Sequence, residues 1–80
     1  MTIKIYTTHT CPWCDVAKDF LRSKDVPFIE IDVQTNRAAA QEMITKSGQM
    51  GVPVIDINGS VIVGFNKNAI EMALSFTKQF

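Results

Sequence analysis

The 80-residue chain is long enough for one domain and too short for two, so we expect a single domain spanning residues 1–80. Its eight Lys and Arg residues balance its eight Asp and Glu residues, whereas a nucleic-acid-binding face or a polybasic membrane anchor would need an excess of cations. We therefore expect no nucleic-acid partner and no membrane partner.

The apolar segments and the cysteines favour a cytoplasmic protein. Residues 1–6 lack an apolar core of signal-peptide length, and no apolar run approaches the roughly 18 residues that span a membrane. A disulfide bond between Cys11 and Cys14 closes a loop that is too small to stabilise a secreted domain appreciably. These features predict a cytoplasmic location. We also expect a monomer, because no extra apolar helix face is evident.

The chain begins with a predicted strand and helix. Residues 3–6 alternate briefly, as a strand does. Thr10 is a suitable helix cap, and Pro12 suits a first helical turn because its missing N–H would have no partner there. The helix continues to about Ser23, since apolar side chains recur at helical spacing. These are Val16, Ala17, Phe20 and Leu21. Four charged residues at spacings of three and four predict a solvated face: Asp15, Lys18, Asp19 and Arg22.

A second strand and helix follow. Residues 28–33 have the composition of a strand, and either Thr35 or Asn36 caps the helix that comes next. Gly48 is expected to end that helix. Its apolar stripe consists of Ala39, Ala40, Met43 and Ile44.

The last third of the chain predicts a hairpin and a helix. Residues 54–57 and 61–63 read as strands joined by Asn58-Gly59, which is a strong signal for a two-residue turn. Asn66 caps the final helix. The order β-α-β-α-β-β-α, with a right-handed first crossover, predicts an α/β fold. We expect a four-stranded mixed sheet in the order 2-1-3-4, with three helices distributed over both faces.

Cys11 and Cys14 carry the predicted chemistry. Cys11 opens the first helix, and Cys14 lies one turn further on the same side. A helix N-terminus presents partial positive charge and unpaired N–H groups, which favour a thiolate at Cys11. Cys14 is placed to attack the mixed disulfide that Cys11 would form with a substrate. Both residues are therefore predicted to be catalytic in thiol–disulfide exchange. Trp13, between them, is interpreted as an apolar wall for the incoming disulfide.

The same pair of cysteines has a metal-binding alternative. Zinc takes about four ligands. His9 offers a third ligand beside the two cysteines, and the chain has no further Cys or His to serve as the fourth. Asp15 lies on the charged helix face, and we interpret His9 as solvated in preference to a role in proton transfer. Because the pair sits at a strand-to-helix junction, we predict no metal and no cofactor. An iron–sulfur cluster or metal held through Cys11 at a dimer interface is the alternative.

The chain resembles the glutaredoxin family along essentially its whole length. The resemblance lies in Tyr6-Thr7, Thr10-Cys11-Pro12-Trp13-Cys14, Ser47-Gly48 and Val52-Pro53, at the family's spacings. It implies a thioredoxin-like fold, thiol–disulfide oxidoreductase activity and disulfide-bearing protein substrates. Asp32-Val33, Gly51-Val52-Pro53-Val54 and Gly64-Phe65 are most similar to the short bacterial and archaeal glutaredoxin-like proteins.

The resemblance also implies a substrate-binding groove. The Val52–Pro53 bond is expected to be cis, with the N–H and C=O of Val52 pairing with substrate backbone; the alternative is a trans proline that starts the third strand. Phe65 is either a groove residue or a core residue beneath the last helix. The residues implied to bind substrate are Trp13, Val52, Pro53, Gly64, Phe65 and Asn66.

The sequence departs from the glutathione-using members at two places. Those members carry Lys where this chain has Thr8, and Gly-Gly followed by Asp where it has Val63-Gly64-Phe65-Asn66-Lys67. Each lost charge-assisted contact weakens glutathione binding by roughly 1.5–3 kcal/mol, although the last helix N-terminus could still hold a carboxylate. Gly64-Phe65 is similar to redoxins that serve ribonucleotide reductase, which continue with Arg-Pro-Asp where this chain has Asn66-Lys67-Asn68. The reductant is therefore either glutathione as co-substrate or thioredoxin reductase.

Overall fold

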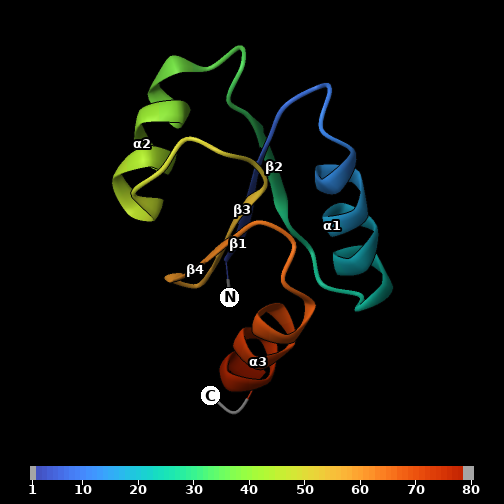
Figure 1. Cartoon of the computed structure of the whole chain (residues 1–80). Helices are drawn as coiled ribbons and strands as arrows, with labels where there is room; N and C mark the ends of the chain where they lie inside the picture. The colour runs from blue at the N-terminus through green and yellow to red at the C-terminus, as the bar shows by residue number, and fades with distance from the viewer. Residues whose placement is uncertain (1, 79–80) are drawn as a thin grey trace.

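The computed structural model of the chain describes residues 2–78. Strands and helices follow in the predicted order, and α1 and α2 lie on opposite sides of the sheet (Figure 1). The elements are β1 (Ile3–Thr7), α1 (Pro12–Ser23), β2 (Ile29–Asp32), α2 (Arg37–Ser47), β3 (Val54–Ile57), β4 (Ser60–Val63) and α3 (Lys67–Lys78).

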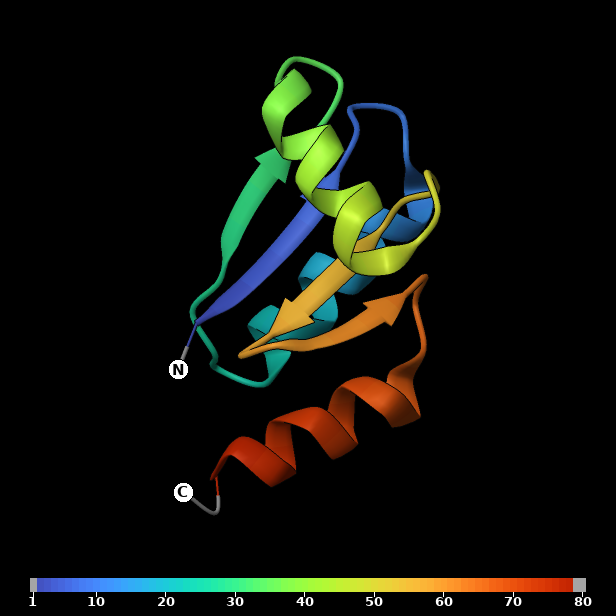
Figure 2. The ribbon, with the colours of Figure 1, turned by 90° about the vertical axis from the view of Figure 1, so that its left-hand side faces the viewer.

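The sheet has the predicted order β2-β1-β3-β4. β1 runs parallel to β2 and antiparallel to β3, so that Ile5 lies opposite both Glu30 and Ile55. β3 and β4 form the antiparallel hairpin seen in Figure 2. Asn58 and Gly59 both have positive φ (51° and 100°), as a two-residue hairpin turn that matches the strand twist requires. The thioredoxin-like α/β architecture is therefore confirmed.

Two apolar layers hold the helices to the sheet, one on each face. Successive side chains of a strand point to opposite faces, so Ile5 packs with α1 and α3 while Tyr6 packs with α2. The larger layer contains Leu21 of α1 and Ile70 of α3, both fully buried. In the smaller layer Met43 of α2 packs on Tyr6. No helix within residues 2–78 is long and apolar enough to cross a membrane.

The helix caps differ from the predictions at one place. Asn36, one of the two predicted caps, begins α2 by accepting the N–H of Ala39 at 3.0 Å. The predicted cap of α1, Thr10, was wrong: Cys11 is the N-cap, in extended geometry, and its Sγ accepts the N–H of Cys14 at 3.1 Å. The sulfur of Cys11, one residue further along, accepts an N–H of the first helical turn, so the Thr10 hydroxyl is not needed there.

Two side chains of α1 also depart from their predicted surroundings. Val16, predicted on the apolar face, is 41% exposed. Lys18, predicted on a solvated face, leaves only 16% of its side chain exposed, because it crosses to Glu30 of β2 at 2.8 Å while staying 3.4 Å from Asp15. Helical spacing alone identifies neighbours along α1, and it carries no information on the strand that lies beside it.

Candidate active site

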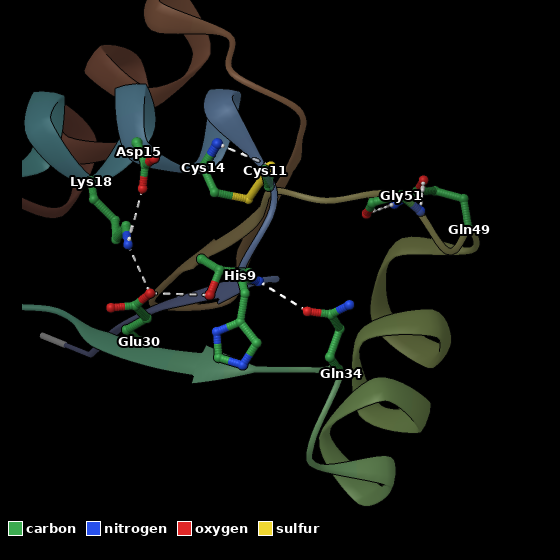
Figure 3. The surroundings of a disulfide bond; sticks show 10 residues. His9, Cys11, Cys14, Asp15, Lys18, Glu30, Gln34, Gln49 and Gly51 are labelled. Atoms are coloured by element: carbon green, nitrogen blue, oxygen red, sulfur yellow. Dashed lines mark hydrogen bonds and ion pairs between the residues drawn. A yellow bond between two sulfur atoms is a disulfide. The ribbon is translucent and has the colours of Figure 1, made fainter.

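A disulfide bond joins Cys11 and Cys14 at the N-terminus of α1, with their Cα atoms 5.2 Å apart (Figure 3). The two cysteines differ in exposure: Cys14 is buried, with 1% of its surface accessible, whereas Cys11 is partly exposed. Only Cys11 can therefore meet a large substrate directly, and Cys14 lies behind it.

The first turn of α1 directs hydrogen-bond donors at Cys11. The N–H of Cys14 donates to the Cys11 sulfur at 3.1 Å, and the N–H groups of Cys14 and Asp15 also approach the Cys11 carbonyl. Pro12 occupies the first helical position, where no N–H is required. Once the disulfide is reduced, the Cys14 N–H and the helix dipole favour negative charge on the Cys11 sulfur. This end of α1 therefore favours the thiolate form of Cys11.

An apolar groove of about 200 Å³ lies beside the disulfide. Its lining contains five of the six residues that the sequence implied for substrate binding: Trp13, Val52, Pro53, Gly64 and Phe65. The Trp13 ring is 62% exposed and stacks on the Phe65 ring, with centroids 6.2 Å apart and planes inclined by 19°. Asn66 is not among the lining residues; its Oδ1 accepts the N–H of Ala69 at 3.1 Å and caps α3, as predicted.

Phe65 has both of the roles between which the sequence left a choice. Its ring packs against the larger core layer and meets Phe20 edge-on, with centroids 5.7 Å apart. Its other side lines the groove with Trp13. The groove wall is therefore anchored in the core, which keeps it in place when Trp13 is contacted from outside.

Three of the residues that line the groove, Val52, Pro53 and Gly64, have distinctive backbone geometry. The Val52–Pro53 bond is cis, as expected from the resemblance. Gly64 adopts a φ of 76°, which favours glycine, and its N–H donates to the Pro53 carbonyl at 2.8 Å. Within residues 2–78, the N–H and C=O of Val52 have no hydrogen-bond partner. This unpaired backbone edge is available to a ligand lying in the groove.

On another side of the disulfide lies a polar cluster that sequence reasoning missed. Thr7 is buried and its hydroxyl donates to Glu30 at 3.1 Å, and Glu30 in turn accepts from Lys18 (Figure 3). The hydrogen bond between Lys18 and Glu30 raises the pKa of Lys18 and lowers the pKa of Glu30. The pairing of β1 with β2 brings Thr7 close to Glu30, and α1 supplies Lys18 from outside the sheet, so no local pattern could have revealed the cluster.

The loop before Cys11 is tied to the end of β2. His9 Nε2 lies 2.6 Å from Asp32 Oδ2, and the His9 N–H donates to the Gln34 side chain at 3.0 Å. The imidazole is 70% exposed, close to the solvated state predicted for it, but it has a carboxylate partner that the sequence did not indicate. Across residues 2–78, no group of three or more His, Cys, Asp or Glu side chains is arranged to hold a metal ion.

The fold and the cysteine pair at a strand-to-helix junction define a class, the thiol–disulfide oxidoreductases of thioredoxin-like fold. Within that class, the glutaredoxin family model matches residues 3–62, and the chain belongs to the glutaredoxin family.

Three relatives illustrate the match. A glutaredoxin-like 8.6 kDa protein in the rubredoxin operon of Clostridium pasteurianum is 49% identical over 69 residues, covering 86% of this chain and 92% of that protein. Glutaredoxin 3 of Escherichia coli is 45% identical over 62 residues, covering 78% and 75%. The structure of the NrdH-redoxin from Escherichia coli superposes with a TM-score of 0.82 at 26% identity, covering 90% and 93%. The family and the fold that the sequence implied are thereby confirmed.

Proposed function

We propose that the protein reduces protein disulfides, or mixed disulfides, through the Cys11–Cys14 dithiol. The observation that carries this proposal is the difference between the two sulfurs. Cys11 is partly exposed and faces the N–H donors of α1, whereas Cys14 is buried directly behind it. An accessible thiolate with a shielded partner is the arrangement that thiol–disulfide exchange requires.

The exchange has two steps. The Cys11 thiolate attacks one sulfur of the substrate disulfide, so that a Cys11–substrate disulfide forms and the other substrate sulfur leaves as a thiolate, which takes up a proton. Cys14 then loses its proton and attacks the Cys11 sulfur, releasing the second substrate thiol. The substrate has gained two electrons and two protons, and the protein is left with the Cys11–Cys14 disulfide. An external dithiol or reductase returns those electrons and protons.

The apolar groove would hold the segment that carries the substrate disulfide. Its lining has no charged side chain, so it suits an uncharged segment whose backbone pairs with the N–H and C=O of Val52. Exposed aromatic rings are frequent anchors in such interfaces. Trp13 and Phe65 would therefore provide the apolar contact, and Val52 would provide the alignment.

Trp13→Ala is expected to lower kcat/KM for reduction of a protein disulfide such as insulin by about 5- to 30-fold, equivalent to ~1–2 kcal/mol of lost contact. The Trp13 ring is mostly exposed in the free protein, so the melting temperature should change little. Met72→Ala is the matched control, because Met72 is 72% exposed on α3 and does not line the groove. Equal losses in the two variants would argue against the groove as the docking site.

The same surface supports a proposal for the electron donor. The two charged contacts of glutathione-using relatives are missing, with Thr8 and Lys67 at the positions concerned. The remaining anion-binding feature, the N-terminus of α3, is already capped, because Asn66 Oδ1 accepts the N–H of Ala69. The structurally similar NrdH-redoxin is a glutaredoxin-like protein with a thioredoxin-like activity profile. We therefore propose thioredoxin reductase, rather than glutathione, as the reductant.

Two NADPH-coupled assays run in parallel test this choice, one supplying thioredoxin reductase and the other glutathione with glutathione reductase. We expect turnover with thioredoxin reductase to exceed turnover with glutathione by at least tenfold, because two charge-assisted contacts of roughly 1.5–3 kcal/mol each are absent. Equal or faster turnover with glutathione would show that Thr8 and Lys67 are tolerated and that glutathione is the donor.

Thr8→Lys is a further test of the electron donor, because it restores the cation that glutathione-using members of the family carry at this position. Thr8 lies in the loop before Cys11 and is partly exposed, so a lysine there can reach solvent without disturbing the core. It should raise glutathione-driven turnover by about tenfold, through one charge-assisted contact to a carboxylate. Turnover with thioredoxin reductase is the internal reference for any general effect of the substitution.

A further inference from the structure

The loop that carries Val52 is closed by the side chain of one residue, Gln49. Its amide oxygen accepts the N–H of Gly51 at 2.6 Å, and its amide nitrogen donates to the carbonyl of Gly51 at 3.0 Å. A single primary amide thus occupies both backbone groups of Gly51, in the way that two residues of neighbouring strands exchange hydrogen bonds. No local pattern of residue types indicates this contact, and the two exchange steps at Cys11 and Cys14 do not involve it.

Gln49 is itself fixed to the end of α2. Its backbone N–H lies 3.4 Å from the Ser47 hydroxyl, and that hydroxyl donates to the carbonyl of Met43 at 2.7 Å. The chain of contacts therefore runs from a helix packed on the sheet, through Gln49, to Gly51. The contacts with α2 therefore fix the orientation of the Gly51 peptide groups, although Gly51 lies in a loop.

The planarity of the peptide bond carries that orientation to Val52. Val52–Pro53 is the cis bond of this loop, so the bond between Gly51 and Val52 is trans. In a planar trans peptide the carbonyl of one residue and the N–H of the next point in opposite directions. Holding the Gly51 carbonyl on the Gln49 amide therefore turns the Val52 N–H away from Gln49. In the view of Figure 3, Gly51 lies between the Gln49 side chain and the disulfide.

We propose that Gln49 is a positioning residue for substrate, which aims the Val52 N–H at the substrate backbone by holding the Gly51 carbonyl. This inference rests on the proposed pairing of Val52 with substrate. The substrate class it favours is a disulfide whose cysteine lies within peptide backbone, because a small organic disulfide has no carbonyl to accept the Val52 N–H.

The experiment compares two disulfides in the same coupled assay: a disulfide-linked dimer of a blocked peptide with a central cysteine, and 2-hydroxyethyl disulfide. The measured quantity is the ratio of the two kcat/KM values. In Gln49→Leu the ratio should fall by about 2- to 10-fold, the equivalent of one hydrogen bond of ~0.5–1.5 kcal/mol. Gln49→Glu should show the same fall, because a carboxylate cannot donate to the Gly51 carbonyl.

A second variant displaces the amide without changing Gln49. A Cβ at Gly51 would lie 2.8 Å from Gln49 Oε1, so Gly51→Ala pushes this flexible side chain away and should lower the ratio similarly. Gln41→Leu is the control; it removes an exposed amide from α2 that makes no hydrogen bond to any residue within 2–78. In the mixed disulfide of Cys14→Ser with the peptide, the Val52 amide hydrogen should exchange more slowly than in Cys14→Ser/Gln49→Leu.

The outcomes separate this inference from the proposed function. A wild-type protein that shows no preference for the peptide disulfide would overturn the pairing at Val52 and this inference with it. A wild-type preference that survives in Gln49→Leu would overturn the role of Gln49 alone. Equal losses with both substrates would also overturn it, since they would mark Gln49 as needed only for loop stability.

Discussion

Cys11→Ser is expected to reduce disulfide turnover to the uncatalysed rate, a loss on the order of 10³-fold or more. A serine hydroxyl is far from ionised at neutral pH, and it cannot form the mixed disulfide on which the exchange depends. Cys11 is the sulfur that receives the N–H of Cys14 at 3.1 Å and that is partly open to solvent. Insulin reduction in the coupled assay measures the loss, and a melting curve of the variant confirms that the fold is retained.

Cys14→Ser is the matched variant, and it should behave differently. Cys11 can still attack, but no buried thiol resolves the product, so Cys11–substrate disulfides should accumulate and be visible on non-reducing gels or by mass spectrometry. Activity on mixed disulfides with a small thiol should survive, since an external thiol can resolve them. Normal turnover in Cys11→Ser would overturn the mechanism. If Cys11→Ser accumulated mixed disulfides and Cys14→Ser did not, the roles of the two sulfurs would be reversed.

The elements and their order were predictable because they rest on local patterns. Alternation identified the first strand, strand-forming residue types identified the others, and Asn58-Gly59 identified the hairpin. The handedness of the first crossover then left few ways to order four strands. The cap of α1 shows the limit of this approach: the residue types indicated Thr10, and only the backbone geometry shows that the sulfur of Cys11 accepts an N–H of the first turn.

The cysteines of the candidate site were predictable from their position, and its supporting contacts were not. Lys18 is one turn from Asp15 along α1, yet its shorter contact is with Glu30, which β2 brings alongside. Gln49 follows the cap of α2 in a segment without periodicity, and its role depends on a loop conformation that no pattern of residue types describes. Contacts of this kind depend on tertiary packing or on one particular backbone turn.

A polar network on the α2 face is the clearest such case. Lys46 donates to Asp56 at 2.7 Å, to the Tyr6 hydroxyl at 2.9 Å and to Glu42 at 3.1 Å, and Tyr6 also donates to Glu42. Burial lowers the pKa of Lys46, but its three hydrogen bonds outweigh burial and raise the pKa. The hydrogen bond from Tyr6, followed by that from Lys46, lowers the pKa of Glu42 to about 2. Burial raises the pKa of Asp56, yet the bonds from Lys46 and the Gly59 N–H leave it lowered.

Lys46→Met is therefore expected to destabilise the fold by about 2–3 kcal/mol at pH 7. The substitution keeps most of the apolar stem but leaves the Asp56 carboxylate, of which only 14% is exposed, without its cation. Removing one partner of a fully buried pair costs more, about 3–5 kcal/mol, and partial exposure reduces that figure here. For a domain of this size the melting temperature should fall by ~10–20 °C. Lys24→Met is the matched control, because Lys24 and Glu71 pair at 3.5 Å with both side chains 41% exposed, and exposed pairs contribute below about 1 kcal/mol.

The pH dependence of folding stability provides a second test of this network. Glu42 and Asp56 have lower pKa values in the folded chain than their ordinary values of 4.5 and 3.8. A carboxylate with a lowered pKa stabilises the fold at pH values above its unfolded pKa, and that stabilisation is lost as the pH falls through the folded pKa. The difference in the free energy of unfolding between wild type and Lys46→Met should therefore become smaller as the pH falls from about 4.5 to 2. Urea titrations measure this difference. A gap that stays constant over that range, or a Lys24→Met variant that loses as much stability, would show that Lys46 acts through its packing and not through its charge.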